Sequence, residues 1–102
     1  SRPAAEAAQR VDRIAAEASD LIGTPRASAP PVVVDGFLGP AKGARSPEGE
    51  AAAALVARTE GVFLDPVFAA KAMAGLLAAA RDGTAVGPVV FLVSGGAPTL
   101  FL

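Results

Sequence analysis

The sequence predicts an α/β fold in which helices cover a parallel β-sheet. Segments with helical spacing of apolar residues alternate with short continuous apolar runs, a pattern typical of buried parallel strands joined by helices. The last apolar run, residues 89–93, leads directly into Ser94, Gly95 and Gly96. Ligands of open sheets bind beyond the carboxyl ends of the strands, so the same pattern predicts where a site lies.

The composition allows one domain with a thin core. The 102 residues include 25 alanines, which bury little area each, and five phenylalanines are the only aromatic residues. The absence of histidine and cysteine excludes a Ser-His triad, a thiol nucleophile, a Cys/His zinc site and any disulfide. Catalysis would have to use serine, lysine or carboxylate groups, and no metal site is expected.

Charge and hydropathy patterning argue against two classes of partner. Nine basic and ten acidic residues give a net charge of -1 without a basic stripe, so no nucleic acid is expected. The apolar runs are shorter than a membrane-spanning segment, so no membrane contact is expected. Together with the lack of cysteine, this leads us to expect a cytoplasmic protein.

A first helix is predicted from the start of the chain to Ile22. Apolar residues recur there at three- and four-residue steps, opposite charged residues. Ser1 and Pro3 are suited to begin this helix and Gly23 to end it. Because the chain opens at a helix start without an initiator methionine, we expect a fragment of a larger protein.

A strand, a loop and a second helix follow. Residues 31–34 form a short apolar run that predicts a buried strand. Residues 36–43 are too rich in glycine and proline for regular structure. The sequence Ser-Pro-Glu at 46–48 then predicts a helix start, and the helix is expected to continue to about Arg58.

The remaining elements are a short strand, a third helix and a final strand. Residues 62–64 predict the short strand, and Asp65 with Pro66 predicts the cap and first turn of a helix that runs to about Arg81. The predicted apolar face of this helix comprises Val67, Phe68, Met73, Leu76, Leu77 and Ala80. The final strand is predicted at residues 89–93.

The end of that strand is the candidate site. A hydroxyl at Ser94 would stand at the carboxyl edge of the sheet, and Gly95 and Gly96 would allow a ligand to approach the backbone. An ordinary strand-to-helix turn gives the same pattern. The residues that the topology would bring toward this edge are Gly39, Lys42, Gly43, Asp65 and Phe68.

Several motifs, in their order and spacing, resemble one enzyme family. The loop GFLGPAKG, the segments TEG and LDPV, and the terminal SGGAP together resemble the C-terminal part of D-cysteine desulfhydrases and aminocyclopropane-carboxylate deaminases. The opening SRPAAEAAQRV is also similar to theirs, so the resemblance extends over essentially the whole chain. These enzymes depend on pyridoxal 5'-phosphate and have the tryptophan-synthase-β-like fold.

The resemblance implies a specific place for this chain in a larger enzyme. Residues 1–102 would be the C-terminal portion of the larger, cofactor-binding domain, part of the three-layer α/β/α parallel-sheet domain of fold type II pyridoxal-phosphate enzymes. The catalytic N-terminal portion would be absent. The implied partners are a small amino-acid substrate and the remainder of the polypeptide, and the full-length protein would be a homodimer.

The resemblance also implies roles for individual residues. In this family the hydroxyl residue before the paired glycines hydrogen-bonds the pyridine nitrogen of the cofactor, so Ser94, Gly95 and Gly96 would bind the cofactor. A neutral hydroxyl leaves that nitrogen mostly unprotonated and favours elimination. Ala69 stands where the deaminase branch carries a glutamate. The resemblance is therefore closer to the desulfhydrase branch, whose β-elimination gives an oxo acid, ammonia and sulfide.

Two departures from the family affect the implied substrate pocket. Phe68 replaces the tyrosine of the family's DPVY motif, and Lys42 replaces the tyrosine of its GYG loop. The Lys42 ammonium could bind a substrate carboxylate or sulfonate, or it could be an ordinary exposed loop group. The resemblance places Lys71 on the helix after the DPVY motif and implies that it is not the Schiff-base lysine, so we expect a helix-surface or capping group.

The family's Schiff-base lysine and phosphate-binding loop match no part of this sequence. No catalytic residue is therefore assigned in this segment, and the isolated chain is expected to be inactive.

Three alternatives remain open on the sequence alone. The parent could act as an aminocyclopropane-carboxylate deaminase or as a sulfo-lyase. It could be a degenerate relative that binds a small ligand or serves in assembly without catalysis. The chain could also be an unrelated α/β module that receives an anion at its final turn.

Overall fold

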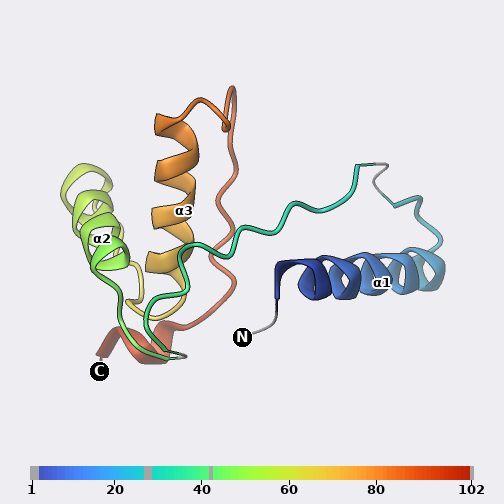
Figure 1. Ribbon diagram of the computed structural model, residues 1–102, viewed down its shortest axis with the longest axis horizontal. Helices are drawn as coiled ribbons and strands as arrows, with labels where there is room; N and C mark the ends of the chain where they lie inside the picture. Colours follow the sequence, from blue (N-terminus) through green and yellow to red (C-terminus); the bar gives the residue numbers. More distant parts are fainter. Residues whose placement is uncertain (1–2, 27–28, 42, 102) are drawn as a thin grey trace. The chain divides into compact units, whose positions relative to one another are not determined.

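The computed structural model describes residues 3–26, 29–41 and 43–101, which fall into two compact units. One unit spans Ser1–Asp35 and contains helix α1, Ala4–Ile22. The other spans Gly36–Leu102 and contains α2, Pro47–Glu60, α3, Ala69–Arg81, and the short 3-10 helix η1, Ala97–Phe101 (Figure 1). Within these described ranges no helix is long and apolar enough to cross a membrane.

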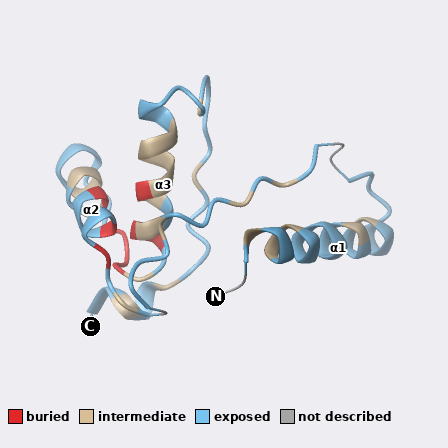
Figure 2. Cartoon of the chain, in the orientation of Figure 1, coloured by how far each residue is buried: buried red, intermediate tan, exposed pale blue. Residues whose placement is uncertain are grey.

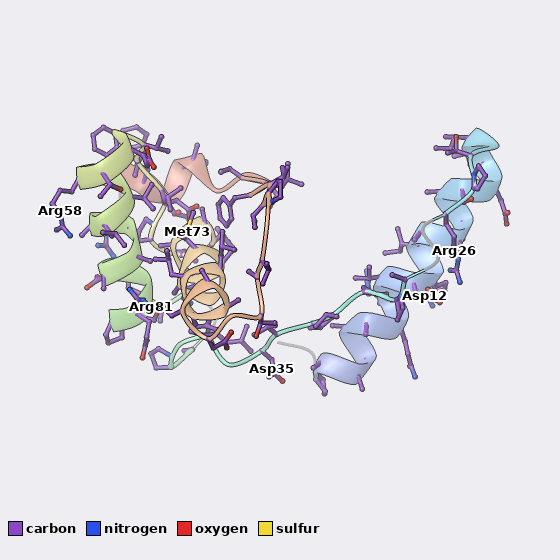
Figure 3. The ribbon with its side chains drawn as sticks, turned by 90° about the horizontal axis from the view of Figure 1, so that it is seen from above. Asp12, Arg26, Asp35, Arg58, Met73 and Arg81 are labelled. Atoms are coloured by element: carbon purple, nitrogen blue, oxygen red, sulfur yellow. The ribbon has the colours of Figure 1, made fainter. Side chains whose placement is uncertain are left out.

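Helix α1 is an amphipathic helix, as predicted from its spacing of apolar residues. It ends at Gly23, whose φ of 69° is the left-handed conformation that glycine adopts readily. After this turn the chain folds back, and the Arg26 guanidinium lies 3.0 Å from the carboxylate of Asp12 and donates to its carbonyl oxygen (Figure 3). The predicted start at Ser1 lies outside the described residues, and the helix begins after Pro3.

Helix α2 begins at the predicted residue and ends close to the predicted one. The hydroxyl of Ser46, which is buried, accepts a hydrogen bond of 3.0 Å from the amide of Gly49, and Pro47 occupies the first turn. Gly61 ends the helix with a φ of 67°. The helix thus runs two residues beyond the predicted Arg58, which is within the usual difference at helix ends.

Helices α2 and α3 pack side by side through small residues (Figure 1). The buried positions on the two helices are Gly49 and Ala52 of α2 and Ala69, Ala70 and Ala74 of α3 (Figure 2). A Cβ atom built on Gly49 would lie 2.8 Å from the Ser46 hydroxyl and 3.4 Å from the amide nitrogen of Lys71. A side chain at Gly49 would therefore displace the capping hydroxyl of Ser46 in its own helix, and it would lie in van der Waals contact with the backbone of α3.

The residues that α3 buries differ from its predicted apolar face. Phe68, expected to be part of that face, is 58% exposed and precedes the helix, which starts at Ala69. Leu76 and Leu77 are half-buried, whereas the alanines between the helices are buried. Helix-to-helix contact through methyl groups draws the axes together and leaves the longer side chains at the margins of the contact.

The strands expected at residues 31–34, 62–64 and 89–93 are not formed in the described ranges, where all regular elements are helical. A strand needs a neighbouring strand to exchange backbone hydrogen bonds, and these apolar segments have none. In the last segment Val90 is 95% and Leu92 80% exposed. The predicted α/β fold is therefore confirmed in its helices and not in its sheet.

Candidate functional site

The candidate site is the turn at residues 94–96, between the last apolar segment and η1. Ser94 is exposed. Gly95 has a φ of 143° and Gly96 a φ of 92°, conformations that side-chain-bearing residues rarely adopt. A Cβ atom on Gly95 would meet no heavy atom within 4 Å, so the backbone there is open to approach. The structure thus shows an open backbone at Gly95, whereas the Cβ position of Gly96 is blocked by Asp65 and Phe68. The cofactor roles of Ser94, Gly95 and Gly96 stay predictions.

Asp65 is the most connected side chain near this turn. It is only 5% exposed, and its Oδ2 accepts from the amides of Val67 at 3.1 Å and Phe68 at 2.7 Å. Its Oδ1 accepts from the amide of Ala69 at 2.9 Å. The predicted helix start at Asp65 and Pro66 is wrong, because α3 begins at Ala69 with Phe68 at its N-cap position. Asp65 nevertheless accepts from the amides of the turn that leads into the helix, which is the chemistry that its prediction as a cap rested on.

The same carboxylate also binds the residues that follow the turn. The hydroxyl of Thr99 lies 2.8 Å from Asp65 Oδ2 and 2.8 Å from the carbonyl oxygen of Gly96. A hydroxyl has one proton, so it donates to one of these two acceptors at a time. The amide of Thr99 also donates to the Gly96 carbonyl at 3.0 Å, which closes the first turn of η1.

Gly96 packs directly on Asp65 and Phe68. A Cβ atom at Gly96 would lie 2.8 Å from Asp65 Oδ1 and 2.9 Å from Phe68 Cδ2, closer than side-chain carbons come to other atoms. We refer to Asp65, Phe68, Gly96 and Thr99 as the Asp65 cluster. In Figure 1 the red η1 accordingly lies at the end of this unit where α3 begins.

The hydrogen bonds of the cluster favour the charged form of Asp65. Burial of the carboxylate raises its pKa, but the hydrogen bonds from Ala69, Phe68, Thr99 and Val67 together outweigh burial and lower the pKa below its ordinary value of 3.8. The Asp65 cluster is therefore built around a carboxylate that stays ionised at neutral pH.

This lowered pKa gives the cluster a defined dependence on acid. The charged carboxylate contributes its full stabilisation above the ordinary pKa of 3.8, and the contribution is lost as pH falls through the lower pKa of the folded state. Thermal unfolding from about pH 2 to about pH 7 should therefore show a stability difference between the natural protein and Asp65→Asn that narrows at the acid end. A difference that stays constant across this range would contradict the prediction.

A small pocket adjoins the turn. It has a volume of about 150 Å³ and is lined by Phe63, Asp65, Val93, Gly95, Ala97 and Leu100. Complete small-molecule sites measure roughly 300–1,000 Å³. The pocket includes both chain neighbours of Ser94 and has about half the volume of the smallest complete sites.

Lys71 joins the glycine-rich loop to α3. Lys42 lies outside the described residues. The ammonium of Lys71, expected to be a surface or capping group, donates a hydrogen bond of 2.8 Å to the carbonyl oxygen of Leu38. A Cβ atom at Gly39 would lie 3.3 Å from the end of this lysine side chain and from Cβ of Ser46. Three chain segments therefore meet at the N-terminal end of α3: this loop, the Ser46 cap and the Asp65 cluster.

Thr99 is the member of this site that the sequence interpretation missed. Its signal was the spacing Gly96–Thr99, in which a hydroxyl residue follows a glycine by three positions and can bond back to the glycine carbonyl. Its second contact, to Asp65, joins residues 34 apart and had no local signal.

Comparison with known proteins gives relatives over the whole chain. The chain is 41% identical over 106 residues to the D-cysteine desulfhydrase of Yersinia enterocolitica, covering 99% of the chain and 31% of that protein. It is 39% identical over 103 residues to that of Yersinia pestis, with the same coverage. It is 46% identical over 79 residues to that of Serratia proteamaculans, covering 72% of the chain and 23% of the protein. No family model matches the chain.

These relatives confirm the resemblance to D-cysteine desulfhydrases that the motifs indicated. The chain spans about a third or less of the length of the curated relatives it matches.

Proposed function

We propose that this chain is the C-terminal portion of the cofactor-binding domain of a pyridoxal-phosphate-dependent lyase that acts on a small amino acid, with D-cysteine as the preferred substrate. The observation that carries the proposal is the identity of about 40% to D-cysteine desulfhydrases along 99% of the chain. The reaction would first release the β-substituent as sulfide. Water would then hydrolyse the remaining unsaturated amine to ammonia and an oxo acid.

The geometry of the turn at residues 94–96 suits one wall of a cofactor site. The Ser94 hydroxyl is exposed, and the neighbouring Gly95 leaves the backbone open on the side of the pocket. These features suit a planar ring whose nitrogen bonds to the serine oxygen. Pyridoxal phosphate, when bound, supplies an electron sink for charge that develops at the substrate α-carbon. The phosphate anchor and the Schiff-base lysine would come from the rest of the polypeptide.

Ser94 and Ala69 support elimination over deaminase chemistry. Ser94 is a neutral partner for the ring nitrogen, so it would keep that nitrogen mostly unprotonated. The methyl group of Ala69 is buried at the start of α3, where its amide bonds to Asp65. This position therefore offers no carboxylate of the kind that the deaminase branch uses.

The proposal extends to substrate, fold and assembly. Phe68, whose ring edge contacts Gly96 and whose side chain is largely exposed, would cover the substrate, and Lys42 would bind its carboxylate. The apolar segments at residues 31–34, 62–64 and 89–93 would join strands of the larger parallel sheet of a fold type II domain. The whole protein would be a cytoplasmic homodimer.

The direct test is on the full-length polypeptide. We expect a visible absorbance band from cofactor bound to lysine, and release of sulfide on addition of D-cysteine. Aminocyclopropane carboxylate and a sulfonated amino acid serve as competing substrates that distinguish the deaminase and sulfo-lyase alternatives. A protein without the band would overturn the proposal.

Replacing Ser94 tests its role in cofactor binding. Ser94→Ala in the full-length protein is expected to shift the absorbance band and to weaken cofactor binding by about tenfold, the effect of losing one hydrogen bond. Ser94→Thr keeps the hydroxyl and is expected to resemble the natural protein in both measurements. If Ser94→Ala leaves the band and the affinity unchanged, Ser94 does not contact the ring nitrogen.

A second candidate function rests on Phe68. Loss of the phenolic hydroxyl at this position, together with Lys42 in place of a second tyrosine, favours a relative that binds a small ligand without catalysis. The sequence that precedes this segment in the full-length protein discriminates the two candidates. A Schiff-base lysine motif there supports the enzyme, and its absence supports the non-catalytic relative.

A further inference from the structure

We infer that Asp65 and Thr99 are positioning residues that fix the direction of the Ser94 hydroxyl. The inference deepens the proposed function and rests on it, because it explains what the contacts of Asp65 and Thr99 with the turn would do for cofactor binding. Neither residue needs to touch the cofactor in this account. Both act on Ser94 through the backbone of the turn at residues 94–96.

The first step is that the Asp65 carboxylate is itself rigidly placed. Three successive amides, at Val67, Phe68 and Ala69, donate to its two oxygens at distances of 2.7–3.1 Å. The group is almost fully buried, and the backbone carbonyl of the same residue accepts from the amide of Ala70 at 2.9 Å. Bonds to both oxygens of the carboxylate prevent its rotation, so its outer edge is a fixed surface at the end of α3.

The second step is that the turn is attached to this surface. The backbone of Gly96 lies so close to Oδ1 and to the Phe68 ring that no side chain fits between them. The Thr99 hydroxyl reaches both Oδ2 and the carbonyl oxygen of Gly96. Packing at Gly96 and hydrogen bonding at Thr99 thus hold the turn at two points, three residues apart.

The third step is that this attachment lies on only one side of the turn. The Cβ position of Gly95 has no heavy atom within 4 Å, and Ser94 is exposed. Within the turn, the backbone is thus held at Gly96, two residues after Ser94, and this is the contact through which we infer that the serine hydroxyl is placed. A hydrogen bond to a ring nitrogen requires placement within about 0.5 Å and 10–20°, which an unattached two-glycine turn would not provide.

The test compares Thr99→Val, which removes the hydroxyl at nearly constant size, with Thr99→Ser, which keeps it. A matched control is Thr84→Ala, because the Thr84 hydroxyl donates to the exposed carboxylate of Asp82 after the other end of α3. All variants are made in the full-length protein. Amide hydrogen exchange is measured without cofactor, and the absorbance band and dissociation constant are measured with pyridoxal phosphate.

We expect Thr99→Val to speed exchange of the amide at position 99, which donates to the Gly96 carbonyl, by at least about tenfold, the effect of losing one hydrogen bond to a charged group. With cofactor, the same variant should shift the band and raise the dissociation constant about threefold to tenfold. Thr99→Ser should restore natural values in both measurements. Thr84→Ala should leave both unchanged.

The outcomes separate this inference from the function on which it rests. Unchanged exchange in Thr99→Val overturns the inference, and so does faster exchange with an unchanged band and affinity. A natural protein that shows no cofactor band overturns the proposed function, whatever the exchange rates are. Failure of Thr99→Ser to restore the natural values would also overturn the inference, because size rather than the hydroxyl would then be the cause.

Discussion

Replacing Asp65 by alanine is expected to lower the free energy of unfolding by about 2–4 kcal/mol. Loss of a helix-capping side chain costs about 0.5–2 kcal/mol, and each buried donor left without a partner adds about 1–3 kcal/mol. The substitution removes the acceptor of three amides and of the Thr99 hydroxyl. Water and the Gly96 carbonyl can replace some of the lost hydrogen bonds. Equilibrium urea unfolding of the full-length protein measures the change.

Asp82→Ala is the matched control for this substitution. Asp82 follows α3 at its other end, and its carboxylate accepts from the amide and hydroxyl of Thr84, but it is exposed to solvent. Water can replace an exposed hydrogen bond, so the loss should be clearly smaller than for Asp65→Ala. If both variants lose the same free energy of unfolding, burial does not strengthen the hydrogen bonds of Asp65.

Gly96→Ala is expected to lower the free energy of unfolding by about 2–6 kcal/mol and to displace the candidate site. Two causes add: a side-chain-bearing residue at positive φ costs about 1–3 kcal/mol, and a methyl group inserted into a packed contact costs about 1–3 kcal/mol. At Gly96 the φ is 92° and the new methyl carbon would lie 2.8 Å from Asp65 Oδ1. Urea unfolding of the full-length protein should show a lower free energy of unfolding, and its cofactor binding should be weaker.

Gly87→Ala separates the two causes. Gly87 has a φ of 82°, close to that of Gly96, but its Cβ position has no heavy atom within 4 Å. This variant should therefore show the cost of the backbone conformation alone, about 1–3 kcal/mol, and leave cofactor binding unchanged. A loss at Gly87 as large as that at Gly96 would mean that the contact with Asp65 is not tight.

The helices were predictable because their signals are local. Ser46 with Pro47 marks the start of α2, Gly23 marks the end of α1, and Asp65 accepts from the amides that lead into α3. Each signal depends on groups within a few residues of one another. The sequence pattern therefore predicted the end of α1 and both ends of α2 to within two residues, whereas α3 starts at Ala69, later than predicted.

The strands and the core were less predictable because both depend on distant partners. Residues 89–93 have the composition of a buried strand, yet a strand exists only where another one pairs with it. The predicted apolar face of α3 followed helical periodicity, but the contact with α2 selected Ala70 and Ala74 over Phe68. For the candidate site, the turn and Asp65 were anticipated, whereas the contact of Thr99 with Asp65 was not.

The alanine contact between α2 and α3 has a consequence for how this protein tolerates sequence variation. Ala70 is fully buried, and its backbone lies 3.5 Å from the Cβ position of Gly49. Interiors made of methyl groups lose little when one is removed, but they have no room for additional atoms. Natural variants at this contact should thus be restricted to the smallest residues, whereas the half-buried leucines beside it are free to exchange with other aliphatic residues.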